Sequence, residues 1–95
     1  MKKSLFKLQE YAVFTFISTS QALKAERVLK NASAEFLMMP TPRKISTSCG
    51  LAVKAALENI HLYHDILVNN QVEIEGEYQV TTIDGKIHSE RVNHG

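Results

Sequence analysis

The most constraining feature of the sequence is a strict alternation of side chains from Val72 to Val80. Apolar or small residues occupy every second position, and polar residues, three of them glutamate, fill the positions between. A period of two predicts a half-buried antiparallel strand with one face in water. A row of glutamates on that wet face would resist pairing with another sheet, so we expect this strand at an edge.

Apolar spacing predicts three elements before it. Tyr11 to Ile17 is aromatic and β-branched with two apolar faces, which indicates a central strand. Residues 21–32 carry apolar side chains at helical spacing, with Ser20 or Thr19 as the expected cap. Residues 35–39 predict a short strand, which the run Pro40-Thr41-Pro42 would end.

The second half of the chain contains one ambiguous stretch. Residues 49–56 alternate weakly and suit a strand, but they are rich in alanine and also suit the start of a long helix capped by Ser48. From Leu57 to Asn70 the apolar spacing is clearly helical. After the alternating strand, Asp84-Gly85 predicts a hairpin turn, and residues 89–95 are expected to form a frayed tail.

This order of elements predicts an α+β fold. Strand, helix and strand occurring twice within one small chain favour a ferredoxin-like βαββαβ sandwich, an antiparallel sheet with two helices on one face. A three-stranded sheet, with 49–70 as a single helix, is the less economical alternative. We expect an N-terminal arm over 1–10, one domain over 11–80, and a C-terminal hairpin or tail over 81–95.

Composition excludes several classes of function. The net charge of +1 is too small for bulk nucleic-acid binding, and no apolar run approaches the roughly 18 residues that span a bilayer. The single cysteine excludes an internal disulfide, and we expect a cytoplasmic protein. Charge is nevertheless uneven, because residues 1–54 carry nine basic and three acidic side chains, and the lone cysteine lies in that half.

The segment from Pro40 to Gly50 holds the candidate chemistry. Arg43 and Lys44 lie six and five residues before Cys49, and a nearby cation favours the reactive thiolate. The hydroxyls of Ser46, Thr47 and Ser48, with free backbone N–H groups, could hold an anion. Gly50 would permit a tight turn or the close approach of a ligand. The alternative is that Cys49 is a small buried hydrophobe, as most free cysteines are.

At this loop the sequence resembles a known family. The string Pro40-Thr41-Pro42-Arg43, followed after two residues by Ser46, Ser48, Cys49 and Gly50, is similar to the hallmark of the selenium/sulfur carrier-like proteins, which are small bacterial proteins. Ser18-Thr19 and the following helix resemble the family's opening segment, and Ile74-Glu75-Gly76 resembles its closing strand. The resemblance covers about residues 11–80. It departs at Ala55-Ala56-Leu57-Glu58, where many members carry an acidic or proline-containing link.

The resemblance implies a carrier rather than a true enzyme, with Cys49 as the attachment point. Cys49 would accept sulfur or selenium as Cys–S–S⁻ or Cys–S–Se⁻ from a desulfurase-like donor protein and release it to the thiol of an acceptor protein. Arg43, Ser46, Ser48 and Gly50 would form the anion and substrate site. We expect no cofactor, metal, nucleic acid or membrane partner, and we leave a homodimer open.

A second hypothesis is a non-catalytic module for ligand binding or subunit docking, in which Cys49 is structural. The second apolar face of the strand at 11–17 would then be a dimer surface or a ligand floor.

The histidines of the chain suggest no specific function. His61 and His64 stand three residues apart on a helix without an obvious third metal ligand, so solvent-facing side chains are the better interpretation.

Overall fold

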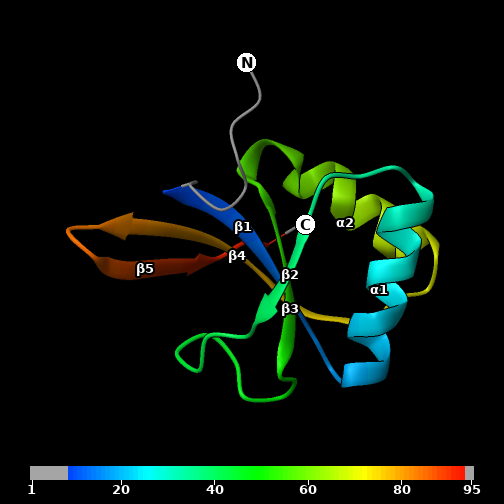
Figure 1. Ribbon diagram of the computed structural model, residues 1–95, viewed down its shortest axis with the longest axis horizontal. Helices are drawn as coiled ribbons and strands as arrows, with labels where there is room; N and C mark the ends of the chain where they lie inside the picture. The colour runs from blue at the N-terminus through cyan, green and yellow to red at the C-terminus, as the bar shows by residue number, and fades with distance from the viewer. Residues whose placement is uncertain (1–8, 94–95) are drawn as a thin grey trace.

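The computed structural model describes residues 9–93, so that most of the expected arm and the last two residues, including His94, lie outside the described residues. Within this range the chain forms five strands and two α-helices. Figure 1 shows the helices side by side against the sheet. The elements are β1 Glu10–Phe16, α1 Thr19–Asn31, β2 Leu37–Pro40, β3 Leu51–Ala56, a short 3-10 helix Leu57–Asn59, α2 Ile60–Asn69, β4 Ile74–Ile83 and β5 Lys86–Arg91.

The sheet is antiparallel throughout, with strand order β2-β3-β1-β4-β5. The expectation of an α+β fold with two helices and an antiparallel sheet is therefore confirmed. The architecture is not a plain ferredoxin-like βαββαβ sandwich, because β5 adds a fifth strand beside β4. None of the helices within residues 9–93 is long and apolar enough to cross a membrane.

β1 is the central strand, as its two apolar faces predict. Phe14 and Phe16 face the helices and join the main core, which takes Leu29 from α1 and Leu67 from α2. Val13 lies in a smaller cluster on the opposite face of the sheet, with residues of β3 and β4. Burial on both faces explains why the strand shows no polar alternation.

The ambiguous stretch at 49–56 resolves as a strand. β3 pairs with both β1 and β2, and Ala52, Val53 and Ala55 are fully buried. Small and β-branched side chains fit a position with neighbours on two sides and packing above and below, so tertiary contacts override the helical preference of alanine. α1 also starts two residues before the expected 21–32, because Ser18 rather than Thr19 or Ser20 is the cap and its hydroxyl accepts a hydrogen bond from Gln21 N–H.

The strict alternation of β4 misled the sequence interpretation in two ways. β4 is not an edge strand, since it pairs with β1 on one side and β5 on the other. The pairing register also shifts between Thr15 and Phe16, so that Glu75 is the extra residue of a β-bulge. The bulge brings Ile74 to the core beside the helices and leaves Glu77 buried at 5% exposure.

The C-terminal segment is more ordered than expected. The hairpin at Asp84-Gly85 is present, and both turn residues have positive φ, 50° and 77°, which is the backbone such a two-residue turn requires. The chain then continues in strand to Arg91, so the expected fraying is wrong for residues 89–91. Every side chain of β5 is exposed.

Candidate functional site

The loop between β2 and β3 carries the cysteine and is closed at its base. Thr41 N–H donates a hydrogen bond to the Gly50 carbonyl at 3.0 Å, where the two strands separate. Within the loop the N–H groups of Ile45 and Ser46 both donate to the Pro42 carbonyl, and Ile45 packs on the apolar cluster of the outer sheet face. The stiff Pro40-Thr41-Pro42 approach thus leads into a folded loop rather than an open one.

Cys49 lies where this loop meets the first turn of α1. Its Sγ accepts a hydrogen bond from Leu51 N–H at 3.4 Å and lies 3.9 Å from the Thr19 hydroxyl. The side chain is 6% exposed and belongs to the main core cluster. Because Thr19 is the first residue of α1, the sulfur lies beside the first turn of that helix.

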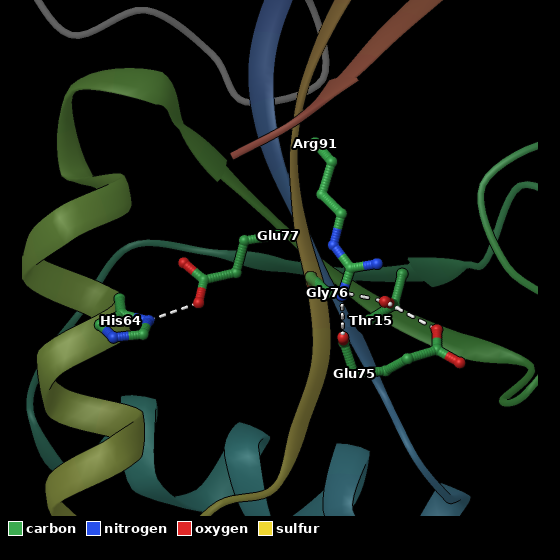
Figure 2. Close-up of polar contacts among 6 residues, drawn as sticks. All are labelled: Thr15, His64, Glu75, Gly76, Glu77 and Arg91. Atoms are coloured by element: carbon green, nitrogen blue, oxygen red, sulfur yellow. Dashed lines mark hydrogen bonds and ion pairs between the residues drawn. The ribbon is translucent and has the colours of Figure 1, made fainter. Parts of the chain in front are cut away.

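Glu75 holds the loop on the sheet. Its carboxylate accepts hydrogen bonds from the Ser46 hydroxyl and from the buried Thr15 hydroxyl, the latter at 3.0 Å (Figure 2). The hydroxyls of Ser46 and Ser48 hold the pKa of the Glu75 carboxyl below its usual range. Thr15 and the charge of Arg91 contribute in the same direction, and burial acts against them. The carboxylate therefore ties the segment just before Cys49 to β1 and β4.

Arg91, at the end of β5, contacts the bulge at Glu75. Its guanidinium donates to the backbone carbonyl of Glu75 at 2.8 Å, which satisfies an acceptor at the bulge (Figure 2). β-bulges leave the extra residue outside the regular ladder of hydrogen bonds, so an outside donor is needed there. Bulge, arginine and serines together make a fixed support for the loop.

The structure brings some of the sequence-predicted site residues together and leaves others apart. Ser46 and Ser48 lie together next to Glu75, and Ser48 N–H also donates to the Ser46 hydroxyl at 3.1 Å. Arg43 is exposed, and within residues 9–93 its side chain makes no hydrogen bond or ion pair. Gly50 is exposed, and apart from its two chain neighbours a Cβ added there would meet nothing within 4 Å.

Local sequence pattern gave two residues of this arrangement, Thr19 and Glu75, no role in the site. Thr19 is 30 positions from Cys49, and Glu75 is 29 positions from Ser46, so the contacts join segments that are far apart in the chain. The only signal for them was the resemblance, which included Ser18-Thr19 and Ile74-Glu75-Gly76. Local spacing instead placed Glu75 on a wet face, because it does not reveal a bulge.

The histidine pair on α2 is not built as a metal site. His64 Nδ1 contacts the carboxylate of the buried Glu77 on β4, so this histidine faces the sheet (Figure 2). His61 is exposed. Among the described residues, no group of three or more histidine, cysteine or acidic side chains is placed to hold a metal ion.

Comparison with known proteins places these features in a family. Neither the curated proteins nor the solved structures gave a match. The family described as "Putative Se/S carrier protein-like" matches residues 10–79, a range that starts at β1 and ends within β4. That range includes Cys49, Thr19 and Glu75. Because the match covers most of the chain, this protein belongs to the Se/S carrier protein-like family.

Proposed function

We propose that the protein carries sulfur or selenium as a persulfide or selenosulfide on Cys49. The observation that supports this most is the position of the sulfur, between the Leu51 N–H and the first turn of α1. Backbone N–H groups and helix N-termini are common anion-binding groups, and here they would hold the terminal anion of a persulfide. Membership of the family supports the same cargo.

Loading would be a transfer without net oxidation. The Cys49 thiolate attacks the terminal sulfur of a donor persulfide, the donor's S–S bond breaks, and the donor leaves as a thiolate. The thiol proton of Cys49 is lost to solvent before the attack. Unloading is the same step with the acceptor's thiolate as nucleophile and Cys49 as leaving group. For selenium, the transferred atom is selenium and the bond on the carrier is S–Se.

The Ser46 hydroxyl is already bonded to another group, because it donates its hydrogen bond to Glu75. A persulfide anion on Cys49 would therefore depend on backbone N–H groups and on the N-terminus of α1. A partner would have to reach Cys49, a residue that is only 6% exposed, beside the exposed Gly50. Arg43 would attract the anionic donor from the loop's exposed surface.

Loading by a cysteine desulfurase and its substrate tests the proposal. Intact-mass measurement of the reduced protein should show one added sulfur atom, removed by a thiol reductant, and Cys49→Ser should show none. The serine hydroxyl keeps Leu51 N–H and Thr19 as partners, so the variant should melt within a few degrees of the parent protein. A stable Cys49→Ser variant that still gains sulfur would contradict the assignment.

The alternative is a docking or ligand-binding module of ferredoxin-like type with a structural cysteine. The low exposure of Cys49 and its membership of the main core favour it. Alkylation of the native protein against pH separates the two functions. A carrier reacts quickly near neutral pH, whereas a core cysteine reacts only after denaturation.

A further inference from the structure

The outer edge of β5 is a row of backbone groups that no strand covers within residues 9–93. The hairpin turn is two residues long, so Ile83 and Lys86 form a hydrogen-bonded pair. Val92 N–H donates to the Glu77 carbonyl at 2.7 Å, which confirms that even-numbered residues of β5 bond to β4. Ile87, Ser89 and Arg91 therefore direct their N–H and C=O groups outward.

We propose that this edge pairs with β5 of a second copy of the chain. The two strands would run antiparallel across a two-fold axis at His88, which makes one sheet continuous through both copies. All six residues of β5 have exposed side chains, so nothing in the described part of the molecule needs to move. Figure 1 shows the β4–β5 hairpin projecting beyond the helices.

The alternation of outward-facing and inward-facing backbone groups along β5 restricts the registers in which two copies can pair. In an antiparallel pair, outward-facing groups must oppose outward-facing groups. The axis must then pass through a residue, and the two central choices are His88 and Ser89. With the axis at His88, Lys86 lies opposite Glu90 of the second copy, and Glu90 lies opposite its Lys86.

Charge complementarity favours the axis at His88. That register forms two opposite-charge cross-strand pairs, while the axis at Ser89 leaves Lys86 opposite an apolar Val92. Ile87, which is 43% exposed, would lie diagonal to Ile87 of the second copy on the outer face of the sheet. Charges on an edge strand usually oppose pairing, but here their signs are self-complementary, as an isologous interface requires.

The first test changes these charges and measures dimerisation of the full chain by sedimentation velocity at increasing concentration. Lys86→Glu and Glu90→Lys should each weaken dimerisation at least tenfold, because each places like charges opposite each other twice. The double variant should dimerise as the parent does. An equimolar mixture of the two single variants should form a heterodimer, since both cross-strand pairs become complementary again.

The backbone provides the second test. Ser89→Pro removes an outward N–H and no bond to β4, so it should abolish the dimer while the circular dichroism spectrum and the dilute-solution melting temperature stay unchanged. In a Cys49→Ser background, His88→Cys should form an interchain disulfide on mild oxidation faster than Ser89→Cys. A parent chain that stays monomeric to roughly millimolar concentration, or a dimer that none of these changes affects, would overturn the proposal.

Discussion

At the scale of single residues, the two cations that precede Cys49 in its loop, Arg43 and Lys44, can be tested against each other. If Arg43 tunes the thiol, Arg43→Ala should slow alkylation of Cys49 at neutral pH several-fold, because a guanidinium in the same loop would stabilise negative charge on the sulfur. Lys44→Ala is the matched control and should do less, since a flexible ammonium is a poorer fixed partner. Both side chains are exposed, so neither change should alter the melting temperature. Equal alkylation rates for all three proteins would show that Arg43 and Lys44 do not affect the reactivity of the Cys49 thiol.

Glu75 gives a pH dependence with a definite sign. Its pKa is lowered in the folded protein from an ordinary value of 4.5, chiefly by the hydroxyls of Ser46 and Ser48. The ionised carboxylate therefore stabilises the fold above that value, and this contribution is lost as pH falls through the lower folded-state pKa. Glu75→Gln should be less stable than the parent at pH 7, and urea titrations should show the difference shrinking as pH falls below 4.5. A difference that grows in acid would contradict this.

At the scale of elements, sequence pattern predicted most of the fold and failed at β4 and at the C-terminal strand. Two apolar faces correctly predicted a central β1, and Asp84-Gly85 correctly predicted a hairpin. The alternation of β4 did not show that Glu75 is an extra residue, so Glu77 was placed in water although it is buried. A bulge depends on the neighbouring strand, here at Thr15, and a local period of two carries no information about that neighbour.

The contact between α2 and β4 gives a second test at this scale. His64 is the partner that meets the buried Glu77 carboxylate from the helix. His64→Ala should cost about 1–3 kcal/mol, because a buried carboxylate loses a hydrogen-bonding partner. Urea unfolding at neutral pH measures the loss. Glu77→Gln should cost less, and the double variant should fall short of the sum of the two single losses. Additive losses would show that the two side chains act independently.

At the scale of the whole molecule, the candidate site is assembled from most of the chain. The loop with Cys49 was recognised from its own residues, because prolines, cations, hydroxyls and a glycine stand together in sequence. Its support was not, since Thr19 begins α1 and Glu75 lies in β4. Contacts between such distant segments follow from the strand order, which brings β1 between β3 and β4. The family match likewise runs from β1 into β4 and stops before β5.

Because the family match ends before β5, we predict that the chain folds without this strand. A chain ending at Ile83 lacks β5, whose side chains are all exposed, but also loses Val92 from the core edge and Arg91 from Glu75. We expect it to unfold cooperatively at a lower temperature, by about 4–8 °C for each kcal/mol lost. Cys49 should retain its alkylation rate, because the contacts of its sulfur come from α1 and β3. Calorimetry with thiol alkylation tests both points, and a truncated chain without a cooperative transition would show that β5 is required for the fold.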